Sequence, residues 1–511
     1  MLDPTDEQLA AIDAFREGHH LALQAGAGTG KTTTLALLAD SVKTRGRYIA
    51  FNKAIATAAA RTFPRHVLCK TAHAMAYAAV GHRYQARMNG PRIPGWRTGA
   101  DLGITKPTRI GTRDISTRAL SHTLLQTVTR FCHSADTELD THHVAPLRGI
   151  DTPEDRAELA ELVLPHARKA WDDLQQPDEG VVRFDHDHYL KIWALTDPRI
   201  PADFLLLDEA QDTNPVLEHV IAAQRDHAQL VLVGDSAQAI YAWRGARDVM
   251  TGFDGHHLHL SRSFRFGPHL AEEANRWLAI AEAPIRLTGT PDIPTTLGTS
   301  WQQPAAILCR TNVGAMIEVL HHLHAGHRVA LAGGGGALQS LALAARDLKA
   351  GKHTTHPELL LFKTWAELQD YADKDPSGRD LAPLVDLVDE HGTDTILAAI
   401  NQLTHEDRAQ ITISTAHKAK GREWPSVRIA DDFPPPHDDE SRKDEDGNPL
   451  PGPINTAEAR LSYVAVTRAR HHLDLGGLSW IHHHPDGNPH LDAPTAAPSS
   501  SVSKLLARGI H

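Results

Sequence analysis

Short apolar runs alternate along this chain with segments of helical periodicity. They lie at residues 20–23, 48–51, 67–70, 204–207 and 230–233 in the first half, and at 305–310, 327–331 and 411–415 in the second. Such runs are typical of buried strands in parallel sheets, and their alternation with helices is typical of α/β proteins. The pattern therefore predicts an α/β fold built from two α/β units.

The alternation weakens in two places, which we interpret as mainly helical insertions, and to the first of them, at residues 81–201, we assign no chemistry of its own. Beyond residue 480 the chain is rich in proline, serine and histidine, which predicts a mobile tail. The predicted organisation is a first α/β domain at 1–80 and 202–275, a helical insertion at 81–201, a second α/β domain at 276–336 and 411–480, a short insertion at 337–410, and the tail at 481–511.

The stretch AGAGTGKT, residues 25–32, lies between a predicted strand and a predicted helix. Its glycines let backbone N–H groups turn inward around phosphate oxygens, and the following helix directs its positive N-terminal end at the same anion. Lys31 is expected to reach the outer phosphates, and the Thr32 hydroxyl to bind Mg²⁺. The usual pattern begins with glycine, whereas Ala25 stands first here. The predicted nucleotide contacts of this loop are Ala25, Gly26, Ala27, Gly28, Thr29, Gly30, Lys31, Thr32 and Thr33.

Two carboxylates follow the apolar run at residues 204–207. Asp208 and Glu209 would lie at the carboxyl edge of a central strand, where open α/β sheets bind ligands. Asp208 is suited to hold Mg²⁺, and Glu209 is suited to deprotonate an attacking water. Gln238 follows the next apolar run, and its amide can sense a γ-phosphate. Gln8 either completes a capping box or reads the edge of an adenine.

A cluster of aromatic and cationic residues follows Gln238. Tyr241 and Trp243 stand two apart, with Arg244 beside them. Aromatic rings next to a cation suit the stacking of bases in single strands. The alternative is that Trp243 belongs to the core. Arg265, further along, offers a second cation.

Composition restricts the class of protein. The chain has 511 residues, too many for one core, and three cysteines, which argues against a disulfide framework and fits a reducing compartment. The first residues do not form a signal peptide, and no apolar run approaches a membrane span, so we expect a cytoplasmic protein. The net charge of −11 counts against a generally basic nucleic-acid binder but does not describe a local groove. Eight acidic residues are concentrated at 431–446, which we interpret as a solvated loop.

The 35 histidines raise the question of a metal site. Residues 185–188 read DHDH and could ligate a metal, but no framework such as H-E-x-x-H occurs. We therefore interpret this run as a polar loop.

Together these stretches resemble superfamily-one DNA helicases of the UvrD type. The motifs are AGAGTGKT, LLLDEAQD, VLVGDSAQAIYAWRGA, STAHKAKGREW and RLSYVAVTRAR, in the order of that family between Gln8 and Arg470. AFNKAIA and CKTAHAMAY resemble the F-box DNA helicase branch more closely, although we find no F-box segment. The resemblance implies two RecA-like P-loop motor domains, with ATP between them and single-stranded DNA across the top.

The resemblance also implies roles for individual residues. Gln8 would contact adenine and Phe264 would stack on it. The residues implied on the γ-phosphate side are Gln238, Arg265, Glu423 and Arg468, and those implied on the DNA track are Phe51, His73, Tyr241, Trp243 and His417. Two departures from the family are Thr33, where arginine is common, and the aromatic residue of AFNK, which is shifted by one position.

We therefore expect an ATP-dependent DNA helicase or translocase that uses ATP and Mg²⁺ and moves 3′ to 5′ in DNA repair or recombination. Its partners would be single-stranded DNA and single/double-strand junctions, with a protein partner or self-assembly for unwinding because residues 337–410 form a short accessory insertion. One alternative is a translocase that strips proteins from DNA with little unwinding. A second is a nucleotide-switched binding module without productive turnover.

Overall fold

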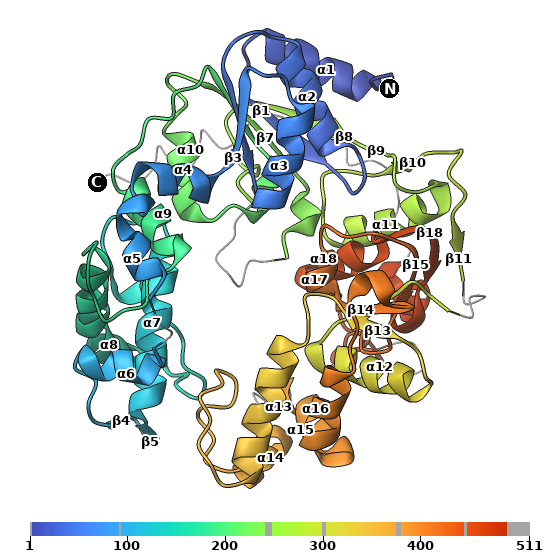
Figure 1. Cartoon of the computed structure of the whole chain (residues 1–511). Coiled ribbons are helices and arrows are strands. Elements are labelled where there is room, and N and C mark those ends of the chain that lie inside the picture. The colour runs from blue at the N-terminus through green and yellow to red at the C-terminus, as the bar shows by residue number, and fades with distance from the viewer. Residues whose placement is uncertain are drawn as a thin grey trace.

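Two six-stranded parallel sheets, each covered by helices, form the centre of the computed structural model (Figure 1). The structure describes residues 3–90, 93–240, 248–298, 303–374, 380–443 and 447–487. This arrangement confirms the predicted α/β fold, and each helix-covered sheet has the construction of a RecA-like P-loop domain. Among the described residues, no helix combines the length and the apolar character needed to cross a bilayer.

The first sheet has the strand order β3-β2-β6-β7-β1-β8. Its strands β1, β6 and β7 are buried along nearly their whole length, because helices and the first insertion cover the two faces. Alternate residues point to opposite faces: Leu206 packs with α1, α2 and α3, whereas Leu207 packs with the first insertion. The elements are α1 (Asp6–Arg16), β1 (Leu21–Ala25), α2 (Lys31–Asp40), β2 (Gly46–Ala50), α3 (Lys53–Thr62), β3 (Val67–Thr71), α4 (Ala72–Ala79), β6 (Phe204–Leu207), α10 (Pro215–Ala222), β7 (Gln229–Gly234) and β8 (His256–Leu260).

The second sheet has the strand order β11-β18-β15-β12-β14-β13. Its central strands β12 and β14 are fully buried, which agrees with their apolar composition. The elements are β9 (Arg262–Ser263), α11 (Pro268–Ile280), β10 (Thr288–Gly289), β11 (Thr296–Leu297), β12 (Ala306–Cys309), α12 (Asn312–His324), β13 (Val329–Leu331), β14 (Ile411–Thr415), α17 (Ala416–Ala419), β15 (Trp424–Ile429), α18 (Thr456–Val466) and β18 (Ala469–Asp474), of which β9 and β10 form a separate pair.

Two mainly helical insertions extend from the same side of the sheets and meet at their far ends (Figure 1). Arg148 of the first insertion donates two hydrogen bonds, of 3.1 and 2.7 Å, to the Asp380 carboxylate of the second. The first contains α5 (Gln85–Met88), α6 (Gly95–Asp101), β4 (Thr108–Ile110), β5 (Arg113–Ile115), α7 (Thr117–His133), α8 (Pro153–Leu174) and α9 (His186–Ala194), and the second contains α13 (Gly336–Lys349), α14 (Trp365–Lys374), α15 (Ala382–His391) and α16 (Thr393–Asn401).

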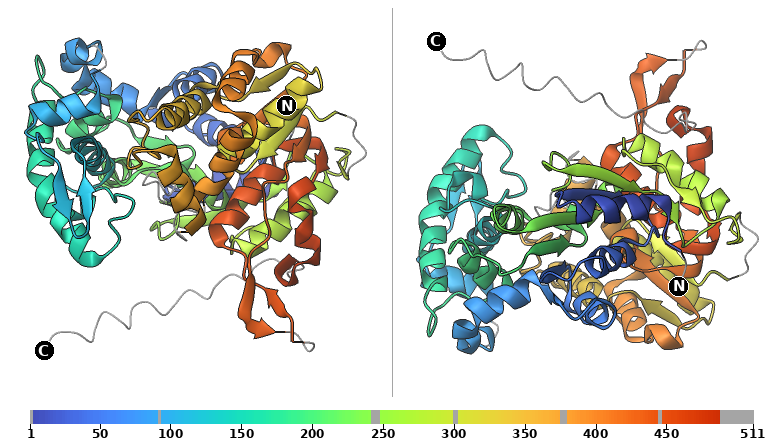
Figure 2. Two further views of the ribbon diagram at one scale, coloured as in Figure 1. Left: turned by 90° about the horizontal axis from the view of Figure 1, so that it is seen from below. Right: turned by 90° about the horizontal axis from the view of Figure 1, so that it is seen from above.

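Three interpretations of loops and tails need correction. Residues 185–188 are not a loop: Asp185 caps α9, and the other three residues form its first turn. The acidic segment contains an exposed antiparallel ribbon of β16 (Asp438–Lys443) and β17 (Pro449–Pro451), which projects from the second domain (Figure 2). The expected tail is packed at its start, because Ile481 is fully buried. Residues 488–511 lie outside the described residues.

Candidate nucleotide and nucleic-acid sites

The loop between β1 and α2 is a tight turn that depends on glycine. Gly28 and Gly30 have φ angles of 76° and 78°, in the left-handed region that other residues rarely adopt. A Cβ atom at Gly28 would lie 2.6 Å from both Arg265 Cβ and Ser263 Oγ. The Thr29 hydroxyl donates a 2.9 Å hydrogen bond to the Gly26 carbonyl. The loop thus presents backbone groups at the N-terminus of α2, where an anion is favoured.

The remaining predicted residues of the loop lie at its two ends. Ala25 is the last residue of β1, and Ala27 is fully buried within the loop. Lys31, Thr32 and Thr33 form the first turn of α2.

Thr32 and Asp208 lie together beside the loop. The Thr32 hydroxyl donates to Asp208 Oδ2 over 3.1 Å, and the Tyr48 hydroxyl donates to the same oxygen over 2.6 Å. Adjacent ligands of octahedral Mg²⁺ lie about 3 Å apart, so these oxygens fit such a site. Burial raises the pKa of Asp208, and the neighbouring Glu209 carboxylate raises it further. A bound cation would compensate this crowded negative charge.

Glu209 occupies a strained backbone conformation. Its φ of 54° is unusual for a residue other than glycine, and such strain is often found at functional sites. Gln211 Nε2 donates a 2.6 Å hydrogen bond to Glu209 Oε2. Burial by itself raises the pKa of Glu209, but the charges of Lys31 and Lys420 and the Gln211 hydrogen bond outweigh burial and lower it. The carboxylate is therefore held ionised, the form that accepts a proton from water.

Gln8 and Phe264 flank Gly30 at the other end of the loop. A Cβ atom at Gly30 would lie 3.8 Å from both Gln8 Nε2 and the Phe264 ring. The Gln8 amide completes a capping box with Thr5 and donates to Thr34 Oγ1 over 2.9 Å. Gln8 thus takes part in a capping box, as one of the two interpretations predicts. Gln8 and Phe264 also lie close to each other, as adenine binding would require.

Gln238, Arg265, Glu423 and Arg468 meet where the second domain faces the loop. Arg265 Nε donates to Glu423 Oε2 over 2.8 Å and Arg265 Nη1 to the Thr467 carbonyl over 3.0 Å. Arg468 is 1% exposed, and its Nη2 lies 3.5 Å from Gln238 Oε1. Burial and the charge of Arg265 lower the pKa of Arg468 to about 9. Two crowded guanidinium groups of this kind suit a phosphate, because an anion would compensate their charge.

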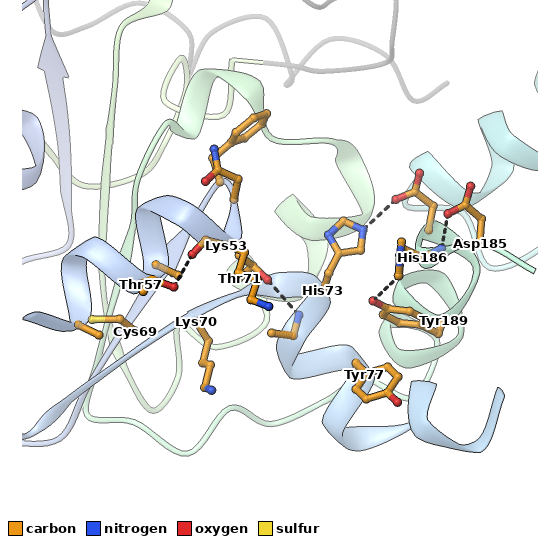
Figure 3. A pocket seen from close by; sticks show the side chains of 16 residues that line it. Lys53, Thr57, Cys69, Lys70, Thr71, His73, Tyr77, Asp185, His186 and Tyr189 are labelled. Carbon is orange, nitrogen blue, oxygen red and sulfur yellow. Dashed lines mark hydrogen bonds and ion pairs between the residues drawn. The ribbon is translucent and has the colours of Figure 1, made fainter. Parts of the chain in front are cut away.

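Phe51 and His73 line one open groove of about 1050 Å³ (Figure 3). They follow β2 and β3, and the Phe51 side chain is 55% exposed. Lys53 and Lys70 line the same groove, so it combines an exposed ring with cations, as single-strand binding requires. The opposite side is formed by residues of α9 and its cap, Asp185, His186, Asp187 and Tyr189. The first insertion, to which we assigned no chemistry, thus contributes to this groove.

The other predicted DNA contacts lie elsewhere. His417, in α17, lines a different hollow of the second domain together with Arg310 and Lys418. Tyr241 and Trp243 lie outside the described residues, so their assignment stays a prediction.

Comparison with known proteins identifies the family. Residues 8–244 match the model of an AAA domain, and residues 360–478 match the UvrD-like helicase C-terminal domain. The chain belongs to the UvrD-like family of superfamily-one helicases. The first match contains the phosphate loop, Asp208 and Glu209, and the second contains Glu423 and Arg468.

Several known proteins share the sequence of this chain at modest identity. F-box DNA helicase protein 1 of Schizosaccharomyces pombe is 28% identical over 92% of this chain and 57% of its own length. F-box DNA helicase 1 of Gallus gallus is 27% identical over 91% of this chain and 48% of its own length. The ATP-dependent DNA helicase UvrD2 of Mycobacterium tuberculosis is 26% identical over 65% of this chain and 55% of its own length. The chain thus spans about half the length of these curated relatives.

Three residues of the candidate nucleotide site were not predicted from the sequence. The Tyr48 hydroxyl contacts Asp208, as described above. The Tyr463 hydroxyl accepts from the Ala27 N–H over 2.9 Å and donates to Asp235 Oδ2 over 2.8 Å. Lys420 Nζ donates to Asp212 Oδ2 and to the Gln238 carbonyl, each over 2.5 Å. Lys420 and Tyr463 lie within the motifs STAHKAKGREW and RLSYVAVTRAR. These motifs could have drawn attention to both residues, but the sequence does not show which residues they contact.

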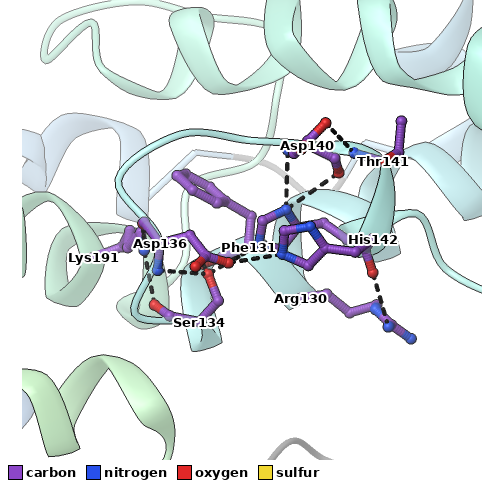
Figure 4. Close-up of polar contacts among 9 residues, drawn as sticks. Arg130, Phe131, Ser134, Asp136, Asp140, Thr141, His142 and Lys191 are labelled. Carbon is purple, nitrogen blue, oxygen red and sulfur yellow. Dashed lines mark hydrogen bonds and ion pairs between the residues drawn. The ribbon is translucent and has the colours of Figure 1, made fainter. Parts of the chain in front are cut away.

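A separate cluster of Asp136, His142 and His143 lies in the helicase's first insertion (Figure 4). The Nε2 atoms of His142 and His143 lie 2.8 and 2.9 Å from Asp136 Oδ2. His143 Nε2 also lies 3.0 Å from Ser134 Oγ. These contacts hold the loop that follows α7. Within the described part of the chain, they give the cluster a structural explanation that needs neither a nucleotide nor a nucleic acid.

Proposed function

We propose that this helicase is an ATP-dependent motor that moves along single-stranded DNA. Contacts that cross between the two domains at the nucleotide site support the proposal most directly. Tyr463 binds the Ala27 N–H of the phosphate loop, and Lys420 binds Asp212 and Gln238 of the first domain. A change at the γ-phosphate would therefore alter contacts between the domains, which is how a nucleotide cycle can drive movement.

The residues of the site suit ATP hydrolysis. Lys31 and the loop backbone would bind the phosphates, while Thr32 and Asp208 would hold Mg²⁺, which neutralises charge on phosphate oxygens. Glu209 would accept the proton of the attacking water, and Arg265 and Arg468 would stabilise the charge that develops on the γ-phosphate. We propose that Gln238 and Glu423 orient these groups, and that Gln8 and Phe264 bind the adenine.

The finer assignments are proposals drawn from the resemblance to the family. They include the 3′ to 5′ direction, a role in repair or recombination, and binding at single/double-strand junctions. We propose that residues 1–80 with 202–275, and 276–336 with 411–480, act as the two motor domains. We further propose that Phe51, His73, Tyr241, Trp243 and His417 contact the single strand.

One alternative is a translocase that clears proteins from DNA and unwinds little. The small second insertion favours it, because its four long helices occupy only residues 336–401 and offer little surface for a duplex. In this case unwinding would need a protein partner or self-assembly. A nucleotide switch without turnover is less well supported, because Glu209 is held ionised, Arg468 lies beside Gln238, and Arg265 contacts the neighbouring Thr467 carbonyl.

Steady-state ATPase rates with single-stranded DNA, duplex DNA and RNA test the proposal. We expect the largest stimulation by single-stranded DNA, and no stimulation by any nucleic acid would contradict a motor. A single-turnover assay on duplexes with a 3′ or a 5′ tail separates the alternatives. Efficient unwinding of the 3′-tailed duplex by the monomer would exclude the clearing translocase.

A further inference from the structure

Asp187, the second residue of α9, lies between two histidines from different parts of the chain. Its Oδ1 is 2.9 Å from Nε2 of His73, on α4 of the first domain, and its Oδ2 is 3.0 Å from Nε2 of His133, on α7 of the first insertion. The Tyr189 ring, two residues further along α9, meets the His73 ring edge to face at 6.1 Å. Two residues of the insertion thus hold one side chain of the motor domain.

The charge on Asp187 determines how His73 is oriented. Burial by itself raises the pKa of Asp187, but hydrogen bonds from His133 and His73 outweigh burial and hold it far below its usual range. An ionised carboxylate only accepts hydrogen bonds, so Nε2 of each histidine carries the donated proton. His73 is therefore fixed in ring position, with a proton on Nε2 directed at Asp187.

His73 lies in the groove that also contains the exposed Phe51 ring and the cations Lys53 and Lys70. Three helices, α3, α4 and α9, begin at this groove, since Asn52, Thr71 and Asp185 cap them and line it. The α3 and α4 side carries both lysines, whereas the α9 side carries both acidic groups, Asp185 and Asp187. A polyanion is therefore favoured along α3 and α4, next to His73.

We propose that Asp187 is a positioning residue for nucleic-acid binding, which holds His73 toward a single strand in this groove and makes the first insertion part of the DNA track. The proposal rests on the proposed function, because it takes single-stranded DNA as the ligand. It assigns a role to the DHDH stretch, which the sequence pattern left as a polar loop.

Whether removal of the Asp187 carboxylate weakens or strengthens DNA binding separates a positioning role from simple charge repulsion. A carboxylate beside a groove repels DNA, so its removal should strengthen binding unless the carboxylate holds a binding group in place. Asp185 provides a matched control, because it faces the same groove but contacts the His186 N–H and not His73. Asp185→Asn keeps the helix cap, since asparagine caps as well as aspartate, and removes one negative charge.

The test measures binding of a fluorescent oligo-dT by anisotropy and DNA-stimulated ATPase activity. We expect Asp187→Ala to weaken DNA binding roughly fivefold or more, the effect of freeing one hydrogen-bonded side chain. The DNA concentration for half-maximal stimulation should rise equally, with kcat at saturating DNA retained. Asp185→Asn should bind DNA as tightly as the wild type or more tightly. The double variant Asp187→Ala with His73→Ala should bind no more weakly than His73→Ala alone.

Three outcomes would overturn the proposal. Asp187→Ala could bind DNA as tightly as Asp185→Asn, or its effect could add fully to that of His73→Ala. In both cases the DNA track stands and only the positioning role is lost. If His73→Ala itself binds DNA normally, the assignment of His73 to the track fails as well. If Asp187→Ala does not fold, Asp187→Asn replaces it, because asparagine keeps one acceptor oxygen. We then expect a smaller loss of DNA affinity. Tighter DNA binding by Asp187→Asn would refute the positioning role.

Discussion

Replacing Tyr463 by phenylalanine tests how the two α/β domains communicate. The Tyr463 hydroxyl is completely buried and lies between the Ala27 N–H of the phosphate loop and the Asp235 carboxylate. Both partners belong to the first domain, whereas Tyr463 lies on α18 of the second. Phenylalanine keeps the ring in place and removes only this connection.

The magnitude follows from the hydrogen bonds that are lost. The bond from the Ala27 N–H is a neutral one, worth about 1 kcal/mol, and the bond to the ionisable Asp235 is worth about 1.5–3 kcal/mol. Asp235 keeps its bonds from Gln238 Nε2, at 2.6 Å, and from the Ala237 N–H, at 3.1 Å. The Ala27 N–H is left in a buried loop without this acceptor. We therefore expect the contact between the domains to weaken by about 2–4 kcal/mol.

Tyr48→Phe is the matched control, because it removes an equally buried hydroxyl from a carboxylate of the same site. Its partner Asp208 lies in the same domain, so the domain contact is untouched. The assay compares basal and DNA-stimulated ATPase rates across Mg²⁺ concentrations. We expect Tyr463→Phe to lose most of the DNA stimulation, and Tyr48→Phe to shift mainly the Mg²⁺ requirement. Equal stimulation in Tyr463→Phe and the wild type would refute the reasoning.

Three further predictions address the chemistry, the track and the first insertion. Glu209→Gln should retain ATP binding and lose roughly 10²–10⁴-fold in turnover, because the general base is gone; near-normal stimulated ATPase would contradict this role. Trp243→Ala should weaken single-strand binding, measured by anisotropy, by about 1–3 kcal/mol. If the variant instead unfolds in part and its folded fraction binds DNA normally, Trp243 belongs to the core. Burial lowers the pKa of Lys191 to about 8, so the unfolded chain binds more protons between pH 8 and the ordinary value of 10.5, and stability should rise with pH in this window. Urea unfolding of the wild type and Lys191→Met checks this, since the rise should be absent from the variant.

Features that depend on neighbours in the chain were predictable from the sequence. The phosphate loop is one example, because the left-handed backbone of Gly28 and Gly30 is available mainly to glycine and the flanking strand and helix follow from local periodicity. The position of Asp208 and Glu209 is another example. They directly follow the buried apolar run of β6, so they must lie at the carboxyl end of this strand. These local signals were enough to predict the fold class, and they also indicated the candidate nucleotide site.

Contacts between distant segments depended on the tertiary structure. Tyr463 and Ala27 are 436 positions apart, and a buried tyrosine in a helix gives no sign of its partner. Asp187 looked like part of a polar loop because alternating Asp and His residues have no helical period. It became a partner of both His73 and His133 only when α4, α7 and α9 packed together. Hydrophobic periodicity determines which face of an element is buried, whereas the packing of those faces determines which polar groups meet, and that second step is not encoded within any single stretch.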